Sequence, residues 1–179
     1  STSGEGKTYI SENLAIAYAV SNKKTLVIGA DLRRPRLYKD FNKYSKYGIS
    51  NYLENSKIKI DDIILKSEDE NLDLIYSGYK PERPAELFAS ERFLELIDKL
   101  KLLYDIIIID TPPVGLVADA LIISKSVDIN LFVVRHKLSS KASLNFINEL
   151  KKNNKFKNIN IVFNDVTSSD ENHYGYGYG

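Results

Sequence analysis

The first eight residues, "STSGEGKT", combine small side chains with one lysine and a terminal hydroxyl at a spacing suited to holding phosphate groups. Small residues such as Gly4 and Gly6 let backbone N–H groups curl around phosphate oxygens. At this spacing Lys7 reaches the β- and γ-phosphates of a nucleotide and the Thr8 hydroxyl holds Mg²⁺. The following helix adds its positive end. These residues therefore predict a site for ATP and Mg²⁺, with Lys7 also catalytic; a glycine-rich turn ahead of a helix is the plainer alternative.

Two carboxylates follow apolar, strand-like runs. Asp110 closes "DIIIID", and an acid at the end of a buried strand is placed to hold Mg²⁺ directly or through water. Asp31 follows "TLVIGA" and would bind the metal or orient a nucleophile. We expect both to be catalytic and metal-binding. The alternative for Asp110 is a helix cap or loop carboxylate, and for Asp31 a solvated charged loop.

Basic residues cluster directly after Asp31, at Arg33, Arg34 and Arg36. Arg33 or Arg34 would neutralise phosphate charge or pair with Asp31, and we expect Arg33 to contact the nucleotide. The cluster is one short loop rather than a basic stripe, and the formal net charge is +1. The charge pattern therefore predicts no nucleic-acid partner.

The chain ends in "DENHYGYGYG", where Tyr174, Tyr176 and Tyr178 alternate with glycine. Such a segment has too few aliphatic residues to form a core, and its glycines raise the entropy cost of ordering it. A tyrosine that accepts a phosphoryl group must enter an active site as an extended, mobile segment. Residues 167–179, at roughly 3.3–3.6 Å each, would span about 40 Å and reach a neighbouring subunit. The alternative is a low-complexity end that adds solubility.

The elements that must position these groups are strands alternating with helices. Helical spacing covers residues 7–21, 84–103 and 140–152, shorter helices are expected at 48–55, 59–67 and 115–126, and apolar strand-like runs occupy residues 25–30, 72–77, 105–110, 129–135 and 158–164. "DIIIID" does not alternate, which indicates a strand buried on both faces. The pattern predicts a three-layer α/β domain with a mostly parallel sheet. A phosphate loop should also follow a strand, and that strand would either lie ahead of Ser1 or be missing from this chain.

Length and composition agree with one globular domain. The 179 residues are 43% hydrophobic and 27% charged and contain no cysteine, which excludes a disulfide framework and a thiolate metal site. No apolar run approaches the roughly 20 residues that span a membrane. We expect a folded domain over residues 1–166 and a flexible tail over 167–179.

These motifs occur in an order that resembles one family. The phosphate loop, "VIGADLRRP", "RPAELFASERF", "DIIIIDTPP" and the tyrosine-rich end are together similar to the bacterial tyrosine kinases that control capsule and exopolysaccharide export. The phosphate loop alone is shared with many NTPases, whereas the other motifs are more specific. The resemblance implies a phosphate-loop NTPase fold and an ATP-dependent protein-tyrosine kinase. It makes Lys7 and Thr8 the phosphate and Mg²⁺ residues and Asp31 and Asp110 the acids of two further motifs. It also makes Asn164 the residue that reads adenine, with a loop turn-former as the alternative.

One position departs from the family pattern. The family commonly has Asp-x-Asp where this chain has Gly29 and Asp31, and the first of those acids is a candidate base for the tyrosine hydroxyl. Gly29 therefore puts an aspartate base at that position in doubt, and activity would rest on Asp31 or be slow.

The resemblance also implies partners and a location. They are a ring-shaped homo-oligomer with the tail phosphorylated in trans, a transmembrane activator of the polysaccharide co-polymerase type, and an opposing tyrosine phosphatase. The domain would lie on the cytoplasmic side, within an inner-membrane protein or a membrane-associated complex.

Other functions on the same fold remain open. A partition or cell-division ATPase carries an extra lysine where this chain has Thr2, and often ends in a basic or amphipathic helix rather than tyrosines. A catalytically weak nucleotide-binding scaffold is suggested by Gly29. A eukaryotic-type kinase is disfavoured because the sequence has no H-R-D or D-F-G motif.

Overall fold

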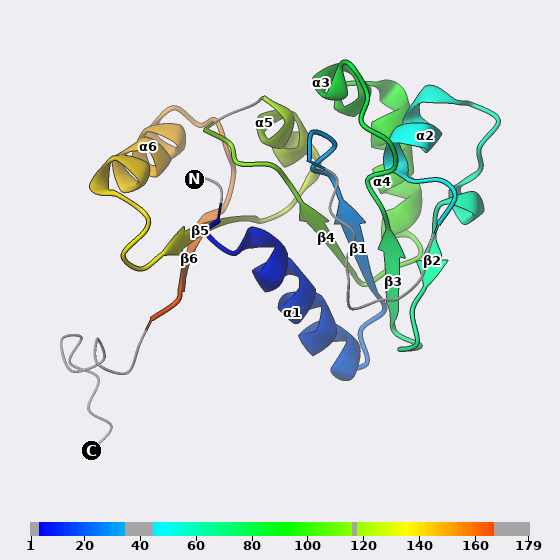
Figure 1. The fold of residues 1–179 in the computed structure, drawn as a ribbon, viewed down its shortest axis with the longest axis horizontal. Coiled ribbons are helices and arrows are strands. Elements are labelled where there is room, and N and C mark those ends of the chain that lie inside the picture. The colour runs from blue at the N-terminus through cyan, green and yellow to red at the C-terminus, as the bar shows by residue number, and fades with distance from the viewer. Residues whose placement is uncertain (1–3, 35–44, 116–117, 167–179) are drawn as a thin grey trace.

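The computed structural model describes residues 4–34, 45–115 and 118–166, which form helices around two groups of strands (Figure 1). The strands are β1 (Thr25–Gly29), β2 (Leu65–Lys66), β3 (Leu72–Ile75), β4 (Ile106–Asp110), β5 (Asn130–Arg135) and β6 (Ile159–Asn164). The helices are α1 (Lys7–Val20), α2 (Ile49–Glu54), α3 (Pro84–Phe88), α4 (Glu91–Lys101), α5 (Asp119–Ile123) and α6 (Lys141–Lys152), with short 3₁₀ turns at Ile60–Asp62 and Ser124–Ser126. The predicted α/β class is confirmed.

β1 lies at the centre of the larger sheet, whose order is β2-β3-β1-β4. It pairs in parallel with β3 on one edge and with β4 on the other, so that Ile28 stands opposite both Ile75 and Ile109. Every residue of β1 is buried, as its apolar run predicts. The short β2 adds an antiparallel edge.

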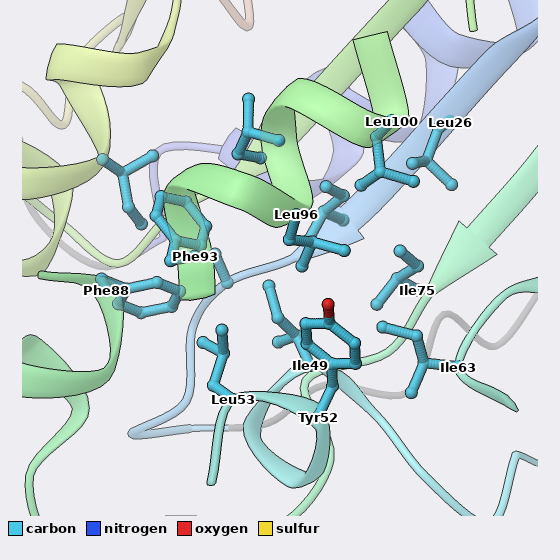
Figure 2. Packing of buried hydrophobic residues seen from close by; sticks show 14 of the residues in the cluster. Leu26, Ile49, Tyr52, Leu53, Ile63, Ile75, Phe88, Phe93, Leu96 and Leu100 are labelled. Atoms are coloured by element: carbon cyan, nitrogen blue, oxygen red, sulfur yellow. The ribbon is translucent and has the colours of Figure 1, made fainter. Parts of the chain in front are cut away.

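Helices cover both faces of this sheet. Leu26 and Ile28 point into a large core with Leu96 and Leu100 of α4. Figure 2 shows Leu26, Leu96 and Leu100 in one cluster with aromatic rings from α2, α3 and α4. Val27, between them in sequence, points to the opposite face and packs with α1. The predicted three-layer arrangement follows from this alternation.

The sheet is interrupted between β4 and β5. β5 pairs in parallel with β6 as a separate two-stranded sheet. A cavity of about 540 Å³ lies between the two sheets, lined by Ile106–Asp110, by Ile129–Val133 and by α1 residues such as Leu14. The isoleucines of β4 are consequently only half-buried. "DIIIID" was expected to be buried on both faces, and the cavity along its outer edge is the physical reason for the difference.

Several predicted helices have different boundaries. The helix expected over 84–103 is two helices, because the Ser90 hydroxyl accepts a hydrogen bond from the Phe93 N–H and caps α4. The helix expected over 59–67 is wrong: a 3₁₀ turn gives way to β2, which pairs with β3. In the segment 115–126, α5 covers only Asp119–Ile123, and residues 116–117 lie outside the described residues.

Within residues 4–34, 45–115 and 118–166, none of the helices combines the length and the apolar character that crossing a membrane requires.

Candidate nucleotide site

The predicted phosphate loop joins the start of α1 through two glycines with left-handed backbone. Gly4 has φ 88° and Gly6 has φ 93°, and Gly6 is the N-cap of the helix. A Cβ at Gly6 would also lie 2.3 Å from Nδ2 of Asn164. Glycine is therefore favoured at Gly6 by its dihedral angle, and a larger residue would also displace the Asn164 side chain. Residues 1–3 of the loop lie outside the described residues.

The structure brings Thr8 and Asp110 together. The Thr8 hydroxyl donates a hydrogen bond of 2.7 Å to Oδ2 of Asp110, whose residue is 7% exposed. Thr8 stands in the first turn of α1, and Asp110 ends β4, so two residues far apart in sequence meet where a strand ends and a helix begins. A hydroxyl and a carboxylate oxygen are ligands that suit Mg²⁺.

These two oxygens would form only part of a metal's shell. Among the described residues there is no group of three or more His, Cys, Asp and Glu side chains that could hold a metal ion. Mg²⁺ usually keeps several waters and binds through one or two protein ligands plus substrate phosphates. Thr8 and Asp110 therefore fit a magnesium ion that arrives with a nucleotide, and their metal-binding role stays a prediction.

Asp31 is engaged in shaping the turn after β1. Its Oδ1 accepts hydrogen bonds from the N–H groups of Arg33, at 3.3 Å, and Arg34, at 3.0 Å. The turn is held near Asp110, because the Ala30 N–H donates to the Asp110 carbonyl oxygen at 2.8 Å. The predicted catalytic and metal-binding role of Asp31 stays a prediction, and any such role must use a carboxylate already hydrogen-bonded to its own turn.

Arg33 has a partner that the sequence interpretation missed. Its Nε donates to Oδ2 of Asp119 at 2.8 Å and its Nη2 to Oδ1 at 3.1 Å, a two-point ion pair. Asp119 is fully buried in the first turn of α5. The hydrogen bond to Asp119 raises the pKa of Arg33 above its ordinary value. Arg33 was expected to contact phosphate or Asp31, and its nucleotide contact remains a prediction beside this ion pair.

Asn164 ends β6 next to the phosphate loop. Its Nδ2 donates to the backbone oxygen of Glu5 at 3.0 Å. The side chain thus ties the end of β6 to the loop, and the adenine-reading role expected by resemblance stays a prediction.

Three residues that sequence reasoning did not select complete the loop's surroundings. Glu5 is fully buried, and its carboxylate meets Lys7 Nζ at 3.3 Å and the Ser139 hydroxyl at 2.9 Å. Arg135, at the end of β5, donates from Nη1 to the Gly4 carbonyl oxygen at 3.1 Å. The sequence features that could have selected two of them are the charged residue at a strand end, Arg135, and the acid inside the loop, Glu5.

The predicted acceptors Tyr174, Tyr176 and Tyr178 lie outside the described residues.

Comparison with known proteins places these features in a family. A family model described as "AAA domain" matches residues 2–162. The chain is 32% identical over 99% of its length to the putative tyrosine-protein kinase CapB of Staphylococcus aureus and covers 77% of that protein. It is 34% identical to the tyrosine-protein kinase YwqD of Bacillus subtilis strain 168, over 98% of this chain and 73% of that one.

Other relatives are much longer than this chain. It is 35% identical over 99% of its length to the putative tyrosine-protein kinase EpsB of Ralstonia solanacearum, yet it spans only 23% of that protein.

Solved structures agree with these sequence comparisons. The kinase domain of the Escherichia coli tyrosine kinase ETK has a TM-score of 0.87 at 31% identity, covering 99% of this chain and 69% of that one. The chimerical protein CapA2B2 has a TM-score of 0.84 at 36% identity, covering 90% and 71%. The septum site-determining protein MinD of Pyrococcus horikoshii, with Mg-ADP, has a TM-score of 0.74 at 22% identity and covers 90% and 66%, which supports the fold alone.

Proposed function

The chain belongs to the bacterial tyrosine-protein kinases built on the phosphate-loop NTPase fold, and we propose that it transfers the γ-phosphoryl group of ATP to tyrosine hydroxyls. The observation that carries this proposal is the contact between Thr8 and Asp110 beside Lys7 at the start of α1. It joins a hydroxyl and a carboxylate at the N-terminus of the helix in which Lys7 is the first residue, where a triphosphate and its metal ion are well stabilised.

In the proposed reaction a tyrosine oxygen bonds to the γ-phosphorus as the bond to the β–γ bridging oxygen breaks, and ADP leaves. Lys7 would offset the charge that develops on the transferred group and the leaving oxygen. Thr8 and Asp110 would hold Mg²⁺, which supplies further positive charge when it is bound with the nucleotide. The phenol proton passes to a carboxylate or to water.

Asp31 is the proposed carboxylate for that proton or for orienting the acceptor. Its Oδ1 accepts hydrogen bonds from two backbone N–H groups, which fix the orientation of the carboxylate. A loose phosphoryl transition state needs little help from a base. Asp31 would therefore serve mainly to orient the tyrosine, in a motif whose first acid is replaced by Gly29.

The proposed acceptors are Tyr174, Tyr176 and Tyr178, phosphorylated in trans within a ring-shaped homo-oligomer. Relatives named CapB and EpsB, a relative from Klebsiella pneumoniae named for the cps region, and a CapA2B2 chimera support a role in polysaccharide polymerisation or export. We propose a cytoplasmic, membrane-associated location, a transmembrane activator and an opposing phosphatase.

The test is mass spectrometry of the chain after incubation with MgATP. Phosphate should appear on the tail tyrosines of the wild type and be absent from Lys7→Met, whose circular dichroism should remain that of the wild type. Equal labelling of a folded Lys7→Met chain would refute the assignment of the loop.

A nucleotide-binding scaffold with weak catalysis is the second candidate, because Gly29 replaces the expected acid and Asp31 is hydrogen-bonded to its own turn. Steady MgATP binding with no phosphotyrosine on any residue would favour the scaffold over the kinase.

A further inference from the structure

Glu5 is an acid in the middle of a loop that should attract anions. It stands between Gly4 and Gly6, and the residue is fully buried. A carboxylate placed this close to a triphosphate repels it, and a buried charge is costly unless it is paired and hydrogen-bonded. Its burial therefore requires specific partners, and those partners indicate what Glu5 does.

The carboxylate is held from two sides. Oε2 forms an ion pair of 3.3 Å with Nζ of Lys7, two residues later in the same loop. Oε1 accepts a hydrogen bond of 2.9 Å from the Ser139 hydroxyl, which itself accepts one of 2.9 Å from the Arg135 N–H. Ser139 is thus oriented by backbone at the end of β5 and directs its proton to Glu5.

We propose that Glu5 is a positioning residue that sets how much of the charge of Lys7 a nucleotide can use. This inference rests on the proposed nucleotide site. Binding of phosphate groups exchanges the Lys7–Glu5 contact for a Lys7–phosphate contact. The free energy needed to break the Lys7–Glu5 contact therefore weakens nucleotide binding. Ser139 reduces this loss by stabilising the carboxylate as the lysine turns away.

The proposal predicts effects of opposite sign on nucleotide affinity for replacement of Glu5 and for replacement of its partner Ser139. Glu5→Gln keeps the shape of the side chain but removes the competing charge, so MgADP should bind about tenfold more tightly. Ser139→Ala removes a hydrogen bond and makes the carboxylate depend more on Lys7, so MgADP should bind a few-fold more weakly. Glu5→Asp keeps the charge and should not tighten binding.

A purely structural role of Glu5 predicts a different pattern. If the carboxylate only holds the loop in shape, both Glu5→Gln and Ser139→Ala should misplace the loop and weaken binding. In a phosphorylation assay, a positioning role instead lowers KM for ATP in Glu5→Gln by more than it changes kcat.

The experiment is calorimetric titration of MgADP into the wild type, Glu5→Gln, Glu5→Asp and Ser139→Ala. Glu95→Gln is the matched control, since it removes one negative charge from the exposed face of α4 and should leave the affinity unchanged. Tighter binding in Glu5→Gln together with weaker binding in Ser139→Ala supports the proposal. Unchanged or weaker binding in Glu5→Gln, with wild-type binding intact, overturns the inference alone. Absence of MgADP binding in every variant overturns the nucleotide site and this inference with it.

Discussion

Asp110 is the residue that connects the start of α1 with the turn after β1. Its carboxylate accepts the Thr8 hydroxyl, and its backbone oxygen accepts the Ala30 N–H that begins the Asp31 turn. The residue is nearly buried, so few waters compete for its oxygens. A bound metal ion would therefore depend on this carboxylate and on the Thr8 hydroxyl aimed at it.

Replacing Asp110 by asparagine tests that dependence. Asp110→Asn keeps the shape and an oxygen that can accept from Thr8, but it removes the charge that a divalent cation requires. We expect the phosphorylation rate at limiting Mg²⁺ to fall about a hundredfold or more, with partial recovery as Mg²⁺ is raised. A Mg²⁺ dependence identical to that of the wild type would contradict the metal role of Asp110.

Tyr104 is a second residue whose environment has a measurable consequence. It is nearly buried, and its hydroxyl donates 2.7 Å to the buried Asp73, which also pairs with Lys66 at 2.6 Å. Burial and the hydrogen bond to Asp73 raise the pKa of Tyr104 above its ordinary value of 10.0. Folding therefore favours the protonated phenol, and its contribution is complete below about pH 10 and lost as the pH rises above that value.

The expected result is a difference in alkaline stability. Tyr104→Phe should cost about 1–2 kcal/mol of unfolding free energy at neutral pH, yet between about pH 9.5 and 11 its stability should fall less steeply than that of the wild type. Urea denaturation across this range measures both slopes. Tyr9→Phe, which alters an exposed tyrosine of α1, is the control. Parallel slopes for wild type and Tyr104→Phe would show that Tyr104 does not carry the pH dependence.

The residues of the candidate site differ in how well the sequence alone predicts their positions and contacts. The places of Thr8 and Asp110 were predictable, because the phosphate-loop spacing puts Thr8 at the start of a helix and the apolar run puts Asp110 at a strand end. Asp119 was not, because it lies within a mainly apolar segment and its partner Arg33 is 86 positions away. Glu5 occupies a loop position whose identity the spacing leaves free, so only its burial reveals a role.

Among elements, the ion pair of Arg33 and Asp119 links the turn after β1 to the start of α5. The two partners are not equivalent, because the side chain of Asp119 is fully buried whereas that of Arg33 is 39% exposed. Removing the arginine leaves a buried charge without its cation, whereas removing the acid leaves a cation that water can reach.

This asymmetry predicts unequal losses of stability. Arg33→Met should destabilise the chain by about 3–5 kcal/mol, and Asp119→Asn by only about 1–2 kcal/mol. Chemical denaturation gives both values, and titration of MgADP into Asp119→Asn asks whether a released Arg33 gains a nucleotide contact. Equal losses in the two variants would contradict the reading that Asp119 is the buried and dependent partner.

Element boundaries were less predictable than element types. Strand β1 followed from its apolar run, but the break between α3 and α4 depends on the Ser90 cap, which a continuous helical spacing conceals. β2 forms because it pairs with β3 as an antiparallel edge strand. The sequence of the β2 segment has mixed polarity and does not predict this pairing. At these two places a capping hydrogen bond and a strand pairing, rather than the local sequence pattern, determine the secondary structure.

Across the whole molecule, the proposed reaction joins two chains through the tail. An active chain truncated after Val166 is mixed with a Lys7→Met chain that keeps Tyr174, Tyr176 and Tyr178. We expect phosphate on the tail of the Lys7→Met chain, because the donor site and the acceptor segment then reside on different molecules. A blank tail, while the intact wild type labels itself, would mean that transfer occurs within one chain.

The phosphorylated tails should also change assembly. Each phosphate adds about −1.5 to −2 charges at pH 7, so three add roughly −5 to a tail that already carries Asp170 and Glu171. Repulsion between tails gathered at subunit contacts would loosen a ring. Light scattering before and after MgATP treatment should record a fall in mass, with Lys7→Met as the control that keeps its mass.

The two sheets are separated by a cavity between β4 and β5. β4 ends at Asp110 beside Thr8, and β5 ends at Arg135 beside Gly4, so both strands run toward the phosphate loop. The cavity of about 540 Å³ is lined by all of β4 and by residues 130–133 of β5. A strand leading into the loop through this cavity would lie parallel to both and satisfy both backbone edges. It would also cover the half-exposed isoleucines of β4, which explains why "DIIIID" reads as a doubly buried strand.

We therefore expect the cavity to accept a strand placed directly ahead of Ser1. Adding six valine and isoleucine residues there should stabilise the chain by about 2 kcal/mol or more, which raises Tm by about 4–8 °C for a domain of this size. Amide hydrogen exchange should slow along β4 and β5 in particular, because both would gain ladder hydrogen bonds. A Gly/Ser extension of equal length is the control, since it has the reach but neither the strand propensity nor the apolar surface. If the two extended chains have the same Tm and the same exchange rates for the β4 and β5 amides, the cavity does not take a strand. The separation of the two sheets is then a property of the fold itself.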